Sequence, residues 1–164
     1  MSRAFVKEDN TEPPLVVPRA PLPDRVANYV TRRGLRLLHE ERAALELARP
    51  NTEVPGGAAA LAAHQARLGA LDARIASAVM IDPATLPHDQ ARFSALVSLQ
   101  DETDAERRYR IVGVDEADAQ SGRIAFTAPL ATALSGKRIG DTVTLRQAGH
   151  AHEYEITSLD YTQE

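Results

Sequence analysis

Apolar residues in the first half of the chain recur with the period of amphipathic helices. Leu35, Leu38 and Leu45 follow Thr31, a favoured helix N-cap residue, and Pro50 ends the pattern. A second helix is predicted from about Ala58 to Val79, along a seam that steps by three and four residues through Leu61, His64, Leu68, Leu71, Ile75 and Ala78. Because the connection is short, the two helices are predicted to form an antiparallel coiled-coil hairpin over residues 29–80.

Alternating apolar and polar residues in the second half of the chain predict short strands. They lie at residues 93–99, 107–114, 123–127, 142–146 and 153–161, with a turn at Gly149. Pro129 suits the first turn of a helix and Gly136 suits its end, so a short helix is predicted between them. Short strands with one helical turn indicate a small antiparallel sheet, and the fold class is predicted to be α+β.

Prolines mark the boundaries between these parts. Residues 1–28 contain five prolines, which cannot join helix or sheet ladders, so this segment is predicted to be a flexible N-terminal arm. Residues 81–90 contain Pro83 and Pro87 and are predicted to be a linker. The β-domain is then expected to span residues 91–164.

Composition and charge restrict the function. The 164 residues include no cysteine, which excludes disulfides and thiolate chemistry, and no apolar run is long enough to indicate a membrane span. These features suit the cytoplasm. The net charge of −4 argues against a strongly basic nucleic-acid binder, although residues 29–80 carry seven arginines against five acidic residues.

Residues that carry chemistry are few. Phosphate-binding glycine loops, nucleophile elbows and cysteine clusters do not occur in the sequence, so we expect no catalytic residue and no cofactor. His150 and His152, in a predicted turn, are too few ligands to favour a metal site. His64 on the helical seam is more typical of a packed or exposed histidine than of a metal ligand.

A specific order of motifs occupies residues 109–161. A strand ends in Ile111-Val-Gly113, an acidic turn follows, and a second strand leads into Pro129-Leu-Ala-Thr-Ala-Leu134. Gly136-Lys-Arg-Ile-Gly-Asp-Thr-Val143 and a final strand with Tyr154-Glu-Ile156 complete the order. This order resembles the C-terminal domain of the bacterial Gre transcript-cleavage factors, the GreA/GreB family. The resemblance implies a transcription elongation regulator with an FK506-binding-protein-like β-domain, and RNA polymerase as its partner.

The resemblance also assigns a tip to the hairpin. Family members insert the hairpin into the polymerase secondary channel, where two acidic tip residues help to hold a catalytic Mg²⁺, an ion that prefers oxygen ligands. Here the tip is Asn51, Thr52, Glu53 and Val54, with one carboxylate. The arms are shorter than in the family, and Arg42 replaces an apolar residue. Polymerase binding without stimulation of transcript cleavage is therefore the expectation.

The resemblance places polymerase docking, at the rim of the secondary channel, on the loop before the short helix. The corresponding residues are Thr127, Ala128 and Pro129, followed by Ala131 and Leu134 in the helix. Thr127 stands where the family often has Asp or Asn. Nucleic acid is expected to be contacted only indirectly, within the transcription complex. One alternative is a polymerase-binding protein similar to the regulator of nucleoside diphosphate kinase, or a competitor of true Gre factors. A more remote alternative is a prolyl isomerase.

Overall fold

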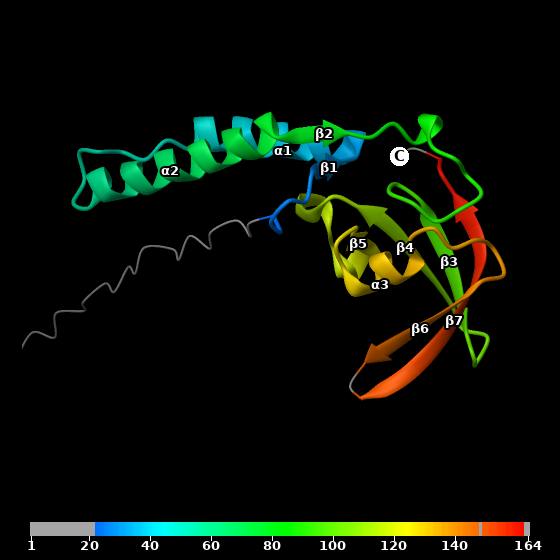
Figure 1. Cartoon of the computed structure of the whole chain (residues 1–164). Coiled ribbons are helices and arrows are strands. Elements are labelled where there is room, and N and C mark those ends of the chain that lie inside the picture. Colours follow the sequence, from blue (N-terminus) through cyan, green and yellow to red (C-terminus); the bar gives the residue numbers. More distant parts are fainter. Residues whose placement is uncertain (1–21, 148, 163–164) are drawn as a thin grey trace, which may run out of the picture.

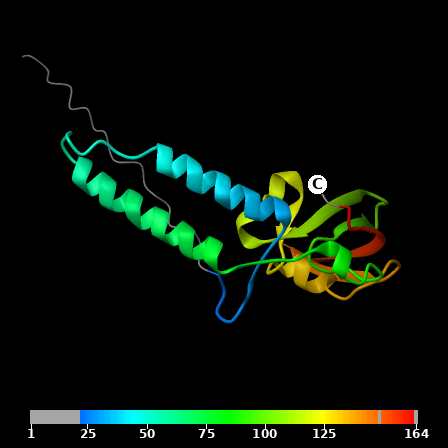
Figure 2. The same ribbon diagram turned by 90° about the horizontal axis from the view of Figure 1, so that it is seen from above.

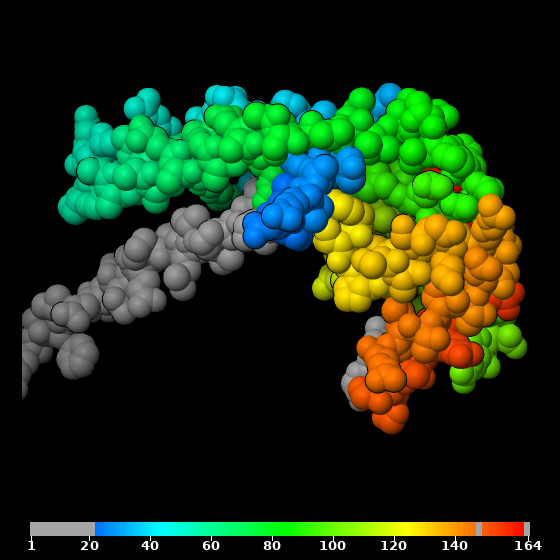
Figure 3. Space-filling model, viewed as in Figure 1, coloured from blue at the N-terminus to red at the C-terminus, as the bar shows by residue number. Residues whose placement is uncertain are grey.

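The computed structural model describes residues 22–147 and 149–162, which form a helical hairpin projecting from a β-domain (Figure 1). Most of the predicted N-terminal arm, residues 1–21, lies outside the described residues. In the space-filling view the hairpin extends well beyond the β-domain as an elongated arm (Figure 3). No helix in the described part of the chain combines the length and the apolarity needed to cross a membrane.

The hairpin consists of α1 (Arg32–Leu47) and α2 (Gly57–Ala76), which lie side by side and are joined at their far end (Figure 2). With 16 and 20 residues, the helices are about 24 and 30 Å long at the helical rise per residue. Thr31 is the N-cap of α1, as predicted, and its side chain accepts a hydrogen bond from the Gly34 N–H. The α+β fold class is confirmed, while supercoiling of the two helices stays a prediction.

Two short strands at the base of the hairpin differ from the sequence prediction. β1 (Asn28–Val30) pairs in parallel with β2 (Ala78–Met80), so Asn28 belongs to a strand rather than to the arm, and Val79 lies beyond α2. The Asn28 side chain donates hydrogen bonds to the Arg74 carbonyl (2.8 Å) and the Ser77 hydroxyl (3.1 Å). Because Asn28 satisfies a carbonyl in the last turn of α2, the helix can end there and the chain can extend into β2.

The predicted seam holds the hairpin together, but not evenly along its length. Leu38 and Leu45 of α1 and Leu71 of α2 are buried together with Val30, and Leu68 and Ile75 pack half-buried against them. Toward the tip, Leu61 and His64 are only half-buried. The buried contacts therefore run from Val30 at the base to Leu45 near the end of α1, and burial is weaker in the first half of α2.

The β-domain is a five-stranded sheet with one short helix. The elements are β3 (Leu96–Asp101), β4 (Glu106–Val112), β5 (Arg123–Ala125), α3 (Pro129–Leu134), β6 (Thr142–Gln147) and β7 (His150–Asp160). The strand order is β5-β4-β3-β7-β6. Short 3₁₀ turns lie at η1 (Pro83–Thr85), η2 (Val114–Glu116) and η3 (Ala119–Ser121).

Three details of the predicted sheet are corrected by this arrangement. β4 and β5 are parallel, so the sheet is mixed rather than antiparallel, because η2 and η3 carry the chain back before β5 begins. Phe93 precedes β3 instead of starting it. His150 and His152 lie in β7 and not in a turn. Alternation of residue types predicts where strands lie, but it does not predict whether neighbouring strands are parallel or antiparallel.

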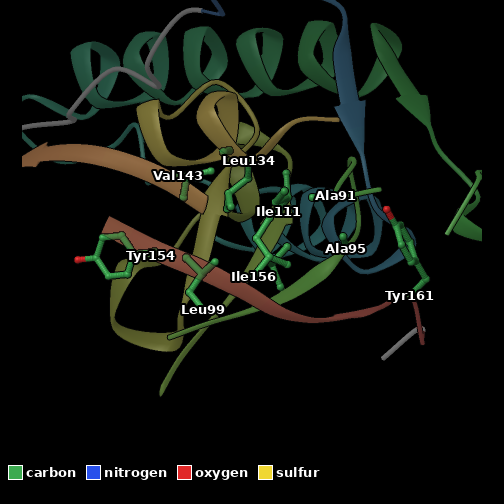
Figure 4. Close-up of a cluster of buried hydrophobic side chains, with 11 residues drawn as sticks. Ala91, Ala95, Leu99, Ile111, Leu134, Val143, Tyr154, Ile156 and Tyr161 are labelled. Atoms are coloured by element: carbon green, nitrogen blue, oxygen red, sulfur yellow. The ribbon is translucent and has the colours of Figure 1, made fainter. Parts of the chain in front are cut away.

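The core of the β-domain lies between the sheet and α3 (Figure 4). Leu134 of α3 is fully buried near Val143, Ile111 and Ile156, which belong to three different strands. Tyr161 closes one end of this core, and its hydroxyl donates a hydrogen bond to the Gln90 carbonyl. Burial of the phenol raises the pKa of Tyr161 above its ordinary value. The core fixes α3, and with it the loop that precedes α3.

Candidate functional site

The tip of the hairpin is a tight exposed loop between α1 and α2. Asn51, Thr52, Glu53 and Val54 are all exposed, and the Asn51 side-chain oxygen accepts a hydrogen bond of 2.8 Å from the Glu53 N–H. The Gly57 N–H donates to the Val54 carbonyl over 2.9 Å. A Cβ atom on Gly57 would lie 2.2 Å from the Asn51 carbonyl oxygen, so the loop as folded requires glycine there.

The chemistry of this tip is poor in metal ligands. Glu53 is the only acidic residue between α1 and α2. Leu47, at the end of α1, is 89% exposed and Val54 is 52% exposed, so apolar side chains face solvent on both sides of Glu53. Among residues 22–147 and 149–162, no group of three or more His, Asp or Glu side chains is placed to hold a metal ion. The tip as folded presents one carboxylate and two apolar side chains.

The acidic residues of α1 near the tip are held in ion pairs. Glu46 Oε1 lies 2.8 Å from Arg42 Nη1, and Glu41 Oε1 lies 3.3 Å from Arg67 Nη2 on the opposite helix. Glu40 pairs with Arg36 on its own helix. These carboxylates lie on α1, away from the loop that forms the tip, and each of them is paired with an arginine. They therefore add no ligand to Glu53 at the tip.

Arg42 replaces the apolar residue that the resemblance places at this position. Its Nε lies 2.6 Å from Asp72 Oδ1 on α2, so the side chain joins the two helices across the hairpin. The hydrogen bond to Asp72 and the charge of that carboxylate raise the pKa of Arg42 above its ordinary value. At this position an ion pair thus takes the place of apolar packing, while Leu45, one turn closer to the tip, is buried.

The predicted docking residues divide into a surface group and a buried group. Pro129 is exposed at the start of α3, and Thr127 and Ala128 are partly exposed beside it. Ala131 and Leu134 are 2% and 0% exposed and belong to the core. In this fold the two side chains offer no surface to a partner, and their part in docking stays a prediction. We call the remaining three residues, Thr127–Pro129, the docking loop.

Hydrogen bonds hold the docking loop in place. The Phe126 N–H donates to the Val112 carbonyl over 2.9 Å, and the Ala128 N–H donates to the Ala125 carbonyl over 2.8 Å. The Ala128 carbonyl in turn accepts from the Thr132 N–H, the first bond of α3, at 2.9 Å. Pro129 has no N–H to satisfy in this first turn. These hydrogen bonds tie the backbone of the docking loop to β4, β5 and the first turn of α3.

An aromatic trio beside the docking loop was not found by the sequence analysis. Tyr29 of β1, Phe93 and Phe126 have ring centroids 5.5 to 6.0 Å apart with tilted or edge-on geometry. All three are partly exposed. The chain has only seven Phe and Tyr residues and no Trp, so the rarity of aromatic residues is a signal that could have singled them out. The trio joins the base of the hairpin to the residue that precedes Thr127.

The histidines considered as metal ligands remain separate from these surfaces. His150 and His152 are exposed and lie two residues apart in β7, so they share one face of the strand. His64 is half-buried on α2. Neither arrangement brings a histidine to the tip or to the docking loop.

Comparisons with known proteins agree on one family. The profile described as "Transcription elongation factor, GreA/GreB, C-term" matches residues 86–161. A protein of Methylobacterium nodulans named transcription elongation factor GreA is 37% identical over 131 residues, which cover 79% of this chain and 82% of that protein. A protein of the same name from Acidiphilium cryptum is 45% identical over 98 residues, which cover 59% of this chain and 62% of that protein.

Solved structures give a more distant likeness. A prokaryotic transcription elongation factor GreA/GreB from Nitrosomonas europaea matches with 20% identity and a TM-score of 0.43, over 81% of this chain and 98% of the other. The GreA factor homolog 1 protein of Thermus thermophilus matches with 19% identity and a TM-score of 0.39, over 82% and 99% of the two chains.

Proposed function

Because the chain belongs to the GreA/GreB family of transcription elongation factors, we propose that it binds core RNA polymerase at the rim of the secondary channel and regulates elongation without stimulating transcript cleavage. The docking loop contacts the polymerase, and the hairpin enters the channel. The observation that carries the second half of this proposal is the tip, where Glu53 is the only carboxylate.

The composition of the tip supports occupancy of the channel without chemistry. Mg²⁺ demands several oxygen ligands in near-octahedral geometry and keeps its waters when few are offered. Glu53 is exposed in the loop, and Glu46, the nearest acidic residue in α1, is paired with Arg42. One flexible carboxylate therefore holds the ion poorly. The protein acts as a binding module rather than as an enzyme, and it needs no cofactor of its own.

The docking loop supports the first half of the proposal. Pro129 is exposed on a segment held by backbone hydrogen bonds. Such a preformed segment favours binding, because little conformational freedom is lost when a partner binds. Thr127 brings no charge to this surface. Binding through the loop is therefore apolar and hydrogen-bonded, and it depends less on salt than binding through a carboxylate would.

Finer features of the fold belong to the same proposal. We take the hairpin to be a short coiled coil, supported by the seam through Leu38, Leu45 and Leu71, and the β-domain to be similar to FK506-binding proteins. Its site of action would be the cytoplasm, and nucleic acid would be contacted only within the transcription complex. By filling the channel the protein would also compete with cleavage-competent Gre factors.

A binding measurement tests docking. Immobilised core RNA polymerase is titrated with the full chain, with Thr127→Arg, and with Thr144→Arg as a matched control on exposed β6. We expect saturable binding, clear weakening by Thr127→Arg, which places a long charged side chain in the loop, and wild-type binding by Thr144→Arg. Absence of binding by the wild-type chain would refute the proposal, and equal binding by all three proteins would refute the assignment of the loop.

A further inference from the structure

Two consecutive acidic residues of the β-domain each hold a different helix of the hairpin. Asp115 and Glu116 lie in η2, directly after β4. Asp115 Oδ2 lies 3.4 Å from Arg74 Nε on α2. Glu116 Oε1 accepts a hydrogen bond of 3.0 Å from Arg33 Nη1 on α1, and Oε2 accepts one from the Thr31 hydroxyl. We call Asp115 and Glu116 the acidic clasp.

The clasp is buried, so its geometry matters more than that of a surface ion pair. The side chains of Arg74, Asp115 and Glu116 are 8%, 9% and 2% exposed. Charges removed from water are costly unless they keep close, well-oriented partners. An orientation of the hairpin that separates these groups is therefore disfavoured. The ion pairs along α1 and α2 are much more exposed and carry no such penalty.

The clasp also orients the start of α1. The Thr31 hydroxyl donates a hydrogen bond to Glu116 and accepts one of 2.8 Å from the Gly34 N–H, by which it caps the helix. Because the hydroxyl hydrogen points to Glu116, a lone pair of the Thr31 oxygen is directed toward the helix N–H. The direction of α1 is coupled to the position of η2 through this one side chain.

Two glycines allow this close approach, one on each side. A Cβ on Gly34 of α1 would lie 2.8 Å from Glu116 Oε2. A Cβ on Gly113, just before η2, would lie 2.6 Å from the Tyr29 carbonyl oxygen in β1. A larger residue at Gly113 would clash with the backbone of β1, and a larger residue at Gly34 would displace the Glu116 carboxylate from its place beside Thr31. The contact is built for one close arrangement.

The clasp and the docking loop follow two neighbouring strands of the sheet. The clasp follows β4, the docking loop follows β5, and these two strands pair in parallel. The aromatic trio adds a second link, because Tyr29 of the hairpin base packs on Phe126 at 5.5 Å between centroids. In the space-filling view, the residues around β1 lie directly against the segment around β5 and α3 (Figure 3).

We propose that Asp115 and Glu116 are positioning residues that fix the direction in which the hairpin leaves the β-domain. When the β-domain docks through the loop, the tip then points in one fixed direction relative to the polymerase. The proposal concerns the free protein, and its consequence in the channel rests on the proposed function. Loss of the clasp leaves the docking loop intact and allows the hairpin to change its orientation relative to the β-domain.

A distance measurement on the free protein tests the clasp. The sequence contains no cysteine, so Thr52→Cys at the tip and Thr144→Cys on β6 give two unique positions for spin labels. Double electron–electron resonance is recorded on this labelled chain, on the same chain with Asp115→Asn and Glu116→Gln singly and together, and with the exposed Glu102→Gln as the matched control. The substitutions keep side-chain size, and far-UV circular dichroism identifies the folded variants.

We expect a narrow distance distribution for the labelled chain and for Glu102→Gln, and a broadened, shifted distribution for the folded clasp variants. A folded Glu116→Gln variant with the unchanged distribution would overturn the proposal. In the polymerase-binding assay, the clasp variants should still show saturable binding, because the docking loop is intact. If the wild-type chain does not bind polymerase, the proposed function fails, and the distance result still decides the role of the clasp.

Discussion

Leu71→Ala tests the apolar centre of the hairpin. Leu71 lies in α2, is 1% exposed and packs in one cluster with Val30, Leu38 and Leu45. The substitution removes three carbon atoms, which at about 0.8 kcal/mol per methylene corresponds to about 2.4 kcal/mol of lost burial. The cavity left behind adds to this loss to the extent that the surroundings do not relax.

Half-buried neighbours reduce the cavity left by Leu71→Ala. Leu68 and Leu35 border the cluster and have room to move inward. We therefore expect the free energy of unfolding to fall by about 2–4 kcal/mol, within the range for buried leucines. Leu47→Ala is the matched control, since Leu47 is 89% exposed on the same hairpin.

Urea unfolding followed by circular dichroism at the helix band measures both variants. Most helical residues lie in α1 and α2, so this signal reports on the hairpin. Leu71→Ala should shift the midpoint strongly, and Leu47→Ala should leave it almost unchanged. A change below about 0.5 kcal/mol for Leu71→Ala, the size typical of surface substitutions, would refute the reasoning that places the hairpin core there.

Further predictions concern the tip, α2 and one titrating turn. Gly57→Ala should destabilise the protein in thermal unfolding because its Cβ meets the Asn51 carbonyl, whereas Gly69→Ala, with open space around it, should stabilise it by about 0.5–1 kcal/mol; stabilisation by both would contradict the clash. Hydrogen bonds from the Thr103 hydroxyl and nearby backbone N–H groups lower the pKa of Asp101. The ionised Asp101 carboxylate contributes to the free energy of unfolding at neutral pH, and this contribution is lost as the pH falls through the lowered pKa. The difference in free energy of unfolding between wild type and Asp101→Asn should therefore shrink in acid, and a difference that stays constant with pH would contradict this.

The sequence predicts the elements of this chain better than their junctions. Period and capping alone placed the N-cap of α1 at Thr31 and located α3 between Pro129 and Gly136, because these signals are local. The direction of β5 and the strand pair β1–β2 depend on what the chain packs against, and a three-residue strand carries almost no periodic signal. Asn28 shows the difference, since only its contacts with Arg74 and Ser77 explain its burial.

The candidate site divides in the same way. Motif order predicts a docking role for Thr127–Pro129 and locates the tip, but it did not distinguish exposed Pro129 from buried Ala131 and Leu134. Ala131 and Leu134 are three residues apart and therefore lie on one face of the helix. This spacing indicates a buried face, which the assignment from motif order did not take into account. In the acidic clasp, Glu116 contacts Thr31, which lies 85 positions earlier in the chain. A local sequence pattern therefore cannot predict this contact.

Transcript cleavage in a backtracked elongation complex tests the central claim most directly. Stalled complexes with labelled RNA receive Mg²⁺ and the wild-type chain, Glu53→Ala, or a cleavage-competent Gre factor with and without the chain in excess. The account predicts no faster shortening of the RNA with either form of this protein than with polymerase alone, and slower cleavage by the competent factor when the chain is present. Shortened transcripts that appear faster with the wild-type chain and vanish with Glu53→Ala would contradict it, and would show that one carboxylate at the tip is sufficient.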